Sequence, residues 1–279
     1  MAASKTTRNR FEEIAAGPDE RIDLGEAALL IAAEEYPGLD VRGYVSRFDV
    51  LALRLEPRLR RARSARDQAE ALTTFLGEEQ GFSGNGEDYY DPRNSYLNEV
   101  LDRRLGIPIS LSVVYLEVAR RAGIALVGVG FPGHFVVRHT GAPDLFLDPF
   151  HGGQVTSAAG LVELIERMAG KKVPIQPSSL DPVPTRAILI RMLQNLKVIH
   201  QGRRDLVRAL AAVDRILALA PNLLEELVVR ATIYSAMGAV PFAVADLERY
   251  LDLAPAGPNR KVVAAKLAEL RAKEVGPRG

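Results

Sequence analysis

The chain has 279 residues, of which 47% are hydrophobic and 25% are charged, with 36 basic side chains against 35 acidic ones. This length exceeds that of an average single domain, so we expect two modules. The charge balance argues against a general nucleic-acid binder, and the complete absence of cysteine excludes a disulfide framework, a thiolate zinc site and catalysis by a cysteine nucleophile.

Residues 1–80 are predicted to form the helical part of a core domain. Apolar periodicity indicates four helices, over residues 9–16, 24–35, 41–56 and 65–77. Asp23 is expected to cap the second of them, with Glu26 completing a capping box. The six arginines between Arg54 and Arg66 are interpreted as a solvated helix face rather than an anion-binding surface.

Residues 81–175 are predicted to form the rest of that core domain. A loop rich in Gly, Asp and Asn, GFSGNGEDYYDP, comes first, at residues 81–92. The pattern then predicts helices over residues 95–105, 110–121 and 157–168, and strands over residues 125–131, 134–139 and 145–150. Helices combined with a small antiparallel sheet indicate the α+β class rather than a doubly wound sheet.

A Pro-rich linker, residues 176–185, is predicted to lead into an all-helical module over residues 186–279. The segments LALAP (217–221) and LDLAP (251–255) lie 34 residues apart. This period, with small residues at fixed points and a closing proline, is typical of tetratricopeptide helix pairs. The C-terminal module is therefore predicted to be a short tetratricopeptide array.

The two copies of the repeat differ at the turn between their helices. Gly238 stands at the turn of the second copy, whereas Arg204 stands at the same place in the first. We expect the nearby Gly202 to serve the first turn instead. A helix over residues 259–274 is predicted to cap the array with a polar outer face.

His134 and Asp148 are the sharpest candidate pair for chemistry. Their strands flank Thr140-Gly141-Ala142, and both residues are seven positions from Gly141, so an in-register hairpin would place them directly opposite one another. A carboxylate that orients an imidazole supports a histidine that acts as a general base. The pair therefore has two interpretations, a catalytic pair and a structural one.

Ser110 follows the turn Gly106-Ile107-Pro108 at the start of a predicted helix. A nucleophile at a helix N-terminus profits from the free N–H groups there, but serine is also a preferred helix cap. Asn94 and Asn98 are candidates for polar groups that line the same site. Both interpretations of Ser110 stay open from the residues alone.

The stretches NSYLNEVLDRRLGIPISLSVVYLEVARRAGI, GVGFPGHFVVR and LFLDPFHGG resemble the bacterial family that joins a transglutaminase-like domain to tetratricopeptide repeats and is known as regulators of SirC expression. The resemblance covers nearly the whole chain. It implies a papain- or transglutaminase-like core whose superfamily uses a Cys-His-Asp triad, with His134 and Asp148 matching the base and its orienting acid. The cysteine has no counterpart in this chain. Ser110 is the nearest candidate, and the short spacing from the helix to Gly123 leaves Pro108 or Ile109 as the alternative aligned position.

The leading hypothesis is a protein-interaction or regulatory protein that lacks the catalytic cysteine and binds a protein or peptide through its repeats. The alternative is a serine-dependent amide hydrolase or acyltransferase that uses Ser110, His134 and Asp148.

A metal-binding hydrolase is a third, weaker hypothesis, with ligands from His134, Asp148 and His151 and from Asp88 or Asp91. No cofactor is predicted. The repeats have a second interpretation as well, in which the two repeats and their cap only pack against the core domain and bind nothing.

The N-terminal residues MAASKTTRNR lack the apolar segment of a secretory signal, and no apolar run reaches the roughly 18 residues that span a bilayer. We therefore expect a cytoplasmic protein without a membrane partner.

Overall fold

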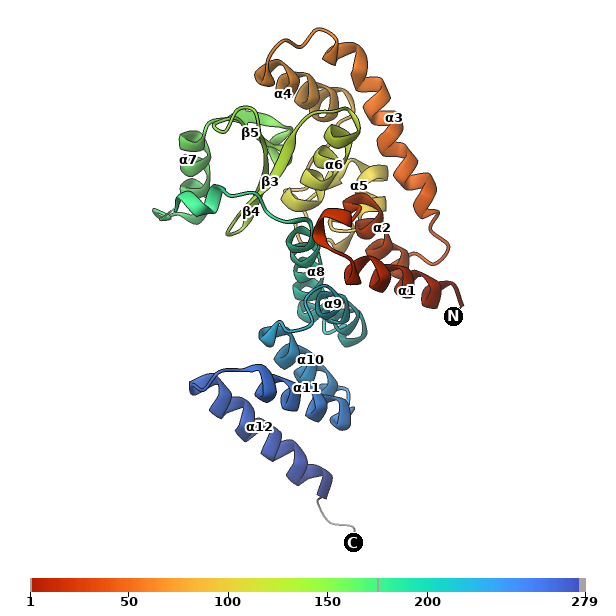
Figure 1. Ribbon diagram of the computed structural model, residues 1–279, viewed down its shortest axis with the longest axis vertical. Helices are drawn as coiled ribbons and strands as arrows, with labels where there is room; N and C mark the ends of the chain where they lie inside the picture. The colour runs from red at the N-terminus through yellow and green to blue at the C-terminus, as the bar shows by residue number, and fades with distance from the viewer. Residues whose placement is uncertain (1, 175, 276–279) are drawn as a thin grey trace. The chain divides into compact units, whose positions relative to one another are not determined.

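A computed structural model of the chain describes residues 2–174 and 176–275. The chain divides into two compact units, Met1–Met192, called the core unit, and Leu193–Gly279, called the repeat unit. The predicted α+β class is confirmed, because the core unit joins helices to a small antiparallel sheet and the repeat unit is helical (Figure 1). The predicted domain limits at residues 1, 175 and 279 lie outside the described residues. The Pro-rich linker at residues 176–185 stays a prediction. Among the described residues, no helix combines the length and hydropathy needed to cross a membrane.

Four helices open the core unit, close to where the periodicity predicts them. They are α1 (Ala2–Ala16), α2 (Leu24–Glu35), α3 (Val41–Leu59) and α4 (Ala65–Thr73). Asp23 caps α2 as predicted, since its carboxylate accepts the Glu26 N–H at 2.8 Å. The predicted capping box is only half formed, because the Glu26 carboxylate instead accepts a hydrogen bond from Arg10 at 3.0 Å.

The predicted helix over residues 65–77 changes its winding after Thr73. Residues Thr74–Glu79 form a π-helix. Gly77 lies within it, against the backbone of Gly152, and a Cβ atom at position 77 would stand 2.1 Å from the Gly152 carbonyl oxygen. Only glycine permits so close an approach of two backbones. The π-helix thereby supports the turn that follows the candidate site.

The remaining elements of the core unit confirm the predicted helices and strands and add short ones. The helices are α5 (Leu97–Arg103), α6 (Pro108–Arg121) and α7 (Ala158–Ala169). The strands are β1 (Ser83–Gly84), β2 (Leu105–Gly106), β3 (Leu126–Phe131), β4 (His134–His139), β5 (Phe146–Asp148) and β6 (Gln154–Thr156). Strands β1 and β2 pair in parallel, whereas β3 to β6 form an antiparallel sheet in chain order. The sequence pattern did not predict β1, β2 and β6, because a strand of two or three residues is too short to show the alternation of apolar and polar residues.

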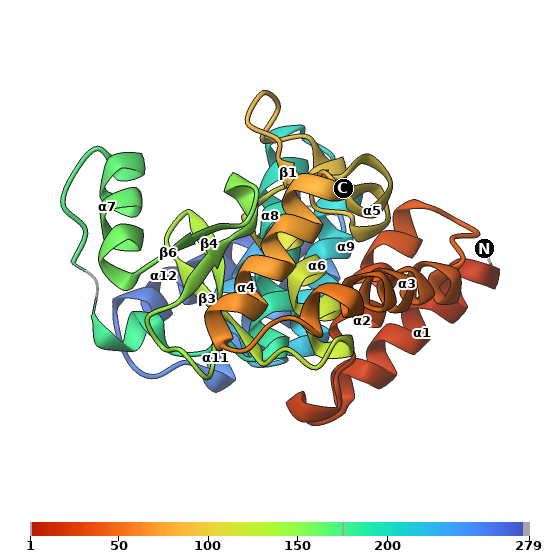
Figure 2. The ribbon, with the colours of Figure 1, turned by 90° about the horizontal axis from the view of Figure 1, so that it is seen from above.

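Helix α7 covers one face of the antiparallel sheet. Its Leu161 and Ile165 are buried against Val129, Val136 and Phe146 from three neighbouring strands. Figure 2 shows the sheet between α7 on one side and helices α1 to α3 on the other. Helix α6 packs against β3 and β4, so β4, the interior strand that begins at His134, is held between packed elements.

The register of β4 and β5 differs from the predicted one by two residues. Val137 pairs with Leu147, which makes Ala142 rather than Gly141 the centre of the hairpin. The prediction that His134 and Asp148 lie directly opposite was therefore wrong. Because side chains alternate with a period of two, a shift of two keeps both residues on one face of the sheet, as diagonal neighbours.

The repeat unit consists of two helix pairs and a final helix, to which α8 contributes from Leu193 onward. The helices are α8 (Thr185–Gly202), α9 (Leu206–Leu219), α10 (Leu224–Ala236), α11 (Val240–Leu253) and α12 (Pro258–Val275). The small residues Ala209 and Ala243, 34 positions apart, are fully buried in one apolar cluster. Helix α12 adds Val263 and Leu267 to that cluster, so the predicted C-terminal helix packs on the preceding pair.

The two inter-helix turns share one backbone conformation despite their different residues. Gly238 has φ +76°, and Arg204, 34 positions earlier, has φ +58°. The prediction that Gly202 would serve the first turn was wrong, because Arg204 itself adopts the left-handed conformation. An arginine there costs on the order of 1 kcal/mol relative to glycine, so helix packing rather than the turn residue sets the geometry.

Arg230 joins three helices of the repeat unit. It donates to Asp246 on α11 at 2.7 Å and to Asp214 on α9 at 3.0 Å, and all three side chains are largely buried. We expect Arg230→Ala to lower the free energy of unfolding by about 2–3 kcal/mol, because two shielded carboxylates lose their partner. Arg271→Ala, which removes an exposed pair with Glu248, should cost no more than about 1 kcal/mol. Denaturant unfolding of both variants tests this; similar losses would contradict it.

Candidate active site

Asp148 is the centre of the candidate site. It ends β5 and caps the 3-10 turn Pro149–His151, where its Oδ1 accepts the N–H groups of Phe150 at 3.1 Å and His151 at 3.4 Å. Its Oδ2 faces two imidazole nitrogens, His134 Nε2 at 2.7 Å and His151 Nδ1 at 2.8 Å. The sequence predicted one partner for this carboxylate, and the structure gives it two histidines.

The carboxylate is ionised at neutral pH. Burial acts to raise the pKa of Asp148, but the hydrogen bonds and charges of His134 and His151 outweigh burial and hold that pKa below its ordinary value. Both ring nitrogens that face an ionised carboxylate must donate, which assigns the proton of His134 to Nε2. The other ring nitrogen, His134 Nδ1, is buried and has no hydrogen-bond partner among the described residues.

Aromatic side chains pack beside the two histidines. The ring of Phe150 stands edge-on to His134, with centroids 6.4 Å apart, and Tyr89 contacts the other side of Phe150. Tyr115 lies fully buried on α6. Burial, followed by the charge of Asp148, raises the pKa of the Tyr115 hydroxyl, which has no hydrogen-bond partner within the part of the chain that the structure describes. His134, Asp148 and Tyr115 are thus shielded from solvent, whereas His151 remains exposed.

Arg191 fixes the backbone that carries His134. Its guanidinium donates to the carbonyl oxygens of Phe131 at 2.5 Å and His134 at 2.6 Å, across the turn between β3 and β4. The same group lies over the Phe135 ring, and burial lowers the pKa of Arg191. Sequence reasoning missed this residue, because it comes from α8 and only tertiary folding brings it to the hairpin.

Ser110 lies in the first turn of α6 and is fully buried, but its hydroxyl is bonded to the backbone. It donates to the carbonyl oxygens of Asn94 at 2.6 Å and Ile107 at 3.1 Å, and it accepts the Ile107 N–H. The structure brings His134 and Asp148 together, but it does not hydrogen-bond Ser110 to either of them. The arrangement matches the capping interpretation of Ser110 more closely than the nucleophilic one.

Asn94 and Asn98 are both buried, and neither touches the histidines through a hydrogen bond in the described residues. The Asn94 amide donates to the carbonyl oxygens of Asp88 and Tyr89, so it ties the loop of residues 81–92 to the N-terminus of α6. Asn98 keeps a buried Oδ1 without a partner. Sequence reasoning missed Ser112, whose hydroxyl donates to the Phe135 carbonyl oxygen at 3.4 Å.

Of the predicted metal ligands, the structure gathers three. Three ligand atoms lie within 4.8 Å of one another, one each from His134, Asp148 and His151. The predicted contributions of Asp88 and Asp91 were wrong, because that group does not include them and the Asp91 carboxylate binds Arg93 at 2.8 Å. Asn94 binds the backbone of that loop through the carbonyl oxygens of Asp88 and Tyr89.

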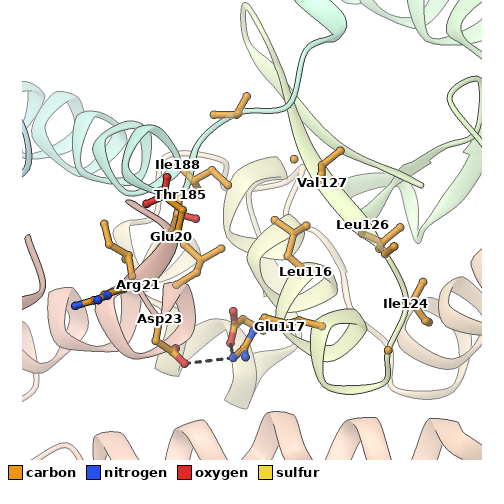
Figure 3. A pocket seen from close by; sticks show the side chains of 17 residues that line it. Glu20, Arg21, Asp23, Leu116, Glu117, Ile124, Leu126, Val127, Thr185 and Ile188 are labelled. Carbon is orange, nitrogen blue, oxygen red and sulfur yellow. Dashed lines mark hydrogen bonds and ion pairs between the residues drawn. The ribbon is translucent and has the colours of Figure 1, made fainter. Parts of the chain in front are cut away.

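A separate pocket of about 610 Å³ lies in the core unit, between the start of α2, the end of α6 and the edge strand β3 (Figure 3). Buried Glu117 lines it, together with Arg120, which also pairs with Asp23. None of the predicted site residues lines this pocket. The candidate site and the pocket are therefore distinct features.

Comparison with known families agrees with this architecture. A family model described as the transglutaminase-like superfamily matches residues 42–194, and a tetratricopeptide-repeat model matches residues 196–268. The fold and the His-Asp pair thus define a protein that joins a transglutaminase-like domain to tetratricopeptide repeats.

Several relatives span the chain. A UPF0162 protein of Xylella fastidiosa is 42% identical over 273 residues, covering 93% of this chain and 94% of the relative. A UPF0162 protein of Pseudomonas aeruginosa is 34% identical, covering 88% and 90%. Human F-box only protein 21 is 33% identical over 189 residues, covering 62% of this chain but 28% of that protein. The chain belongs to the UPF0162 family of the transglutaminase-like superfamily.

Proposed function

We propose that this chain is a protein-interaction or regulatory protein whose transglutaminase-like domain has no catalytic nucleophile. One observation carries the proposal: Ser110 is 0% exposed, and its hydroxyl donates a hydrogen bond to the Asn94 carbonyl oxygen, 2.6 Å away. A serine nucleophile needs its hydroxyl against the base. With no cysteine in the chain, His134 and Asp148 have no thiol to activate.

The repeat unit supplies a surface for a partner. Phe242 is 62% exposed on α11, and its ring lies 5.3 Å from that of Tyr234 on α10, with exposed Met237 in the turn between the two helices. Exposed aromatic and methionine side chains are typical of protein-binding surfaces. We assign a protein or peptide partner to this aromatic patch, defined by Tyr234, Met237 and Phe242.

Labelling by a fluorophosphonate probe tests the absence of a serine nucleophile. The full-length chain should react no faster than Ser110→Ala, because the hydroxyl is buried and bonded to the backbone. The same protein should not join an amine to a glutamine peptide. Stoichiometric labelling that Ser110→Ala abolishes would overturn the proposal in favour of a serine-dependent amide hydrolase or acyltransferase.

Site-directed photo-crosslinking tests the interaction. A benzophenone side chain in place of Phe242 should yield a discrete adduct with a partner in bacterial cells. Val50, which is exposed on α3 of the core unit, gives the matched control position and should yield none. Equal adduct patterns at both positions would contradict a role for the aromatic patch.

A further inference from the structure

We propose that His134, Asp148 and His151 form a binding site for one divalent transition-metal ion. The three residues come from β4, the end of β5 and the turn after it, and their ligand atoms lie within 4.8 Å of one another. This site goes beyond the partner-binding role and does not depend on it.

The distances suit a single ion. Metal–nitrogen and metal–oxygen bonds of about 2.0–2.2 Å place neighbouring ligand atoms about 3.0–3.4 Å apart. Asp148 Oδ2 lies 2.7 Å from His134 Nε2 and 2.8 Å from His151 Nδ1. The two distances to Asp148 Oδ2 therefore need to open by a few tenths of an ångström. The two imidazoles, whose ligand atoms belong to a group that lies within 4.8 Å, need to close on the ion, and the exposed His151 ring is the one with room to move.

The surroundings hold the ligands in place. Asp148 Oδ1 is fixed by the N–H groups of Phe150 and His151, which leaves Oδ2 for the ion. Arg191 fixes the backbone at His134. Such outer contacts orient ligands and strengthen metal binding. A second feature points to a bound species: the Tyr115 hydroxyl is buried close to the Asp148 charge, yet has no partner among the described residues.

The site is open to solvent on one side, and its ligands favour particular metal ions. His134 and Asp148 are 1% and 2% exposed, whereas the His151 side chain is 40% exposed, so an ion would enter past His151. Two imidazoles and one carboxylate favour Zn²⁺, Fe²⁺, Co²⁺ or Ni²⁺ over Mg²⁺ and Ca²⁺, which prefer oxygen ligands. Three protein ligands leave further coordination positions for water.

A metal ion binds an imidazole through a ring lone pair, so each ligating ring is neutral and keeps one proton on the nitrogen that faces away from the ion. On binding, the His134 proton moves from Nε2 to Nδ1, and the His151 proton moves from Nδ1 to Nε2. Each ring then ligates through the nitrogen that faced Asp148, which is already ionised. Metal binding thus replaces the two hydrogen bonds that Asp148 accepts from the histidines with three metal–ligand bonds, one from each residue.

Titration of the chelator-treated full-length chain with Co²⁺ and Zn²⁺ tests the site, followed by calorimetry and by visible absorption of the cobalt complex. The wild type should bind one ion per chain, and Mg²⁺ should not compete. His151→Gln should weaken binding by about 100-fold or more, since loss of an outer-shell partner alone costs 10–100-fold. His139→Gln, which removes a histidine outside the cluster, should bind as the wild type does.

The exposed position of His151 makes its variant informative, because the substitution removes a ligand without opening the core. Circular dichroism confirms its fold before titration. The proposal would be overturned if the wild type bound neither Co²⁺ nor Zn²⁺ at millimolar metal concentration, or if the wild type and His151→Gln bound the ion with equal affinity.

Discussion

Asp148→Ala is expected to lower the free energy of unfolding by about 3–5 kcal/mol. The carboxylate accepts from two backbone N–H groups and from His134 and His151, and its removal strands these donors in a buried site. Urea denaturation measures the loss. Asp148→Asn, which keeps an acceptor oxygen but no charge, should lose about half as much. Glu87→Ala, at an exposed loop position, should change stability by about 0.5 kcal/mol or less.

The same carboxylate gives stability an acid dependence of known sign. The folded pKa of Asp148 lies below the unfolded value of about 3.9. Its contribution is therefore fully present above the unfolded pKa and is lost as pH falls through the folded pKa. Between pH 7 and pH 3, Asp148→Asn should lose less stability than the wild type. Parallel curves for the two proteins would show that the carboxylate is not held ionised by its histidines.

Gly153→Ala is expected to cost about 3 kcal/mol, whereas Gly152→Ala should cost only about 1 kcal/mol. Both glycines have positive φ, +83° and +67°, so both substitutions strain the backbone. They differ in their surroundings. A Cβ at position 153 would lie 2.6 Å from the Tyr115 hydroxyl oxygen and 2.8 Å from Thr73 Cβ, whereas one at position 152 would meet nothing within 4 Å. Overpacking of this kind adds about 1–3 kcal/mol.

A second substitution isolates the cause. Tyr115→Phe removes the hydroxyl oxygen that an alanine at position 153 would meet, so it should recover part of the Gly153→Ala loss while changing the wild type little. A double-mutant cycle from thermal or urea unfolding measures this coupling. Strict additivity of the two changes would show that the loss comes from the backbone and the contact with Thr73, and not from the Tyr115 hydroxyl.

The sequence predicted those parts of the fold that local patterns determine. Apolar periodicity located the helices of the core unit, the Asp23 cap followed from local hydrogen bonding, and a 34-residue period located the repeat helices. It also paired His134 with Asp148, because strand alternation places residues of equal parity on one face. The same pattern could not fix the register, since the hairpin centres on Ala142 through its turn conformation.

The remaining features depend on contacts between distant segments. Ser110 finds its acceptor in Asn94, 16 positions earlier, and Arg191 reaches the hairpin 57 positions before it. No local periodicity encodes such pairs. The π-helix after Thr73 likewise brings Gly77 against Gly152, a contact between segments far apart in the sequence. His151 was foreseen only as a metal ligand, and its hydrogen bond to Asp148 emerged from the 3-10 turn.

Arg204 in its left-handed turn has a consequence for how the repeat unit opens. Both turn residues have a positive φ, but only Arg204 carries a side chain, which strains the backbone in that conformation. Local opening takes place where the free-energy gap is smallest. Amide protons around the first turn therefore exchange with solvent after a local opening of lower free energy than those around Gly238. The two repeats have similar backbones but open at different rates.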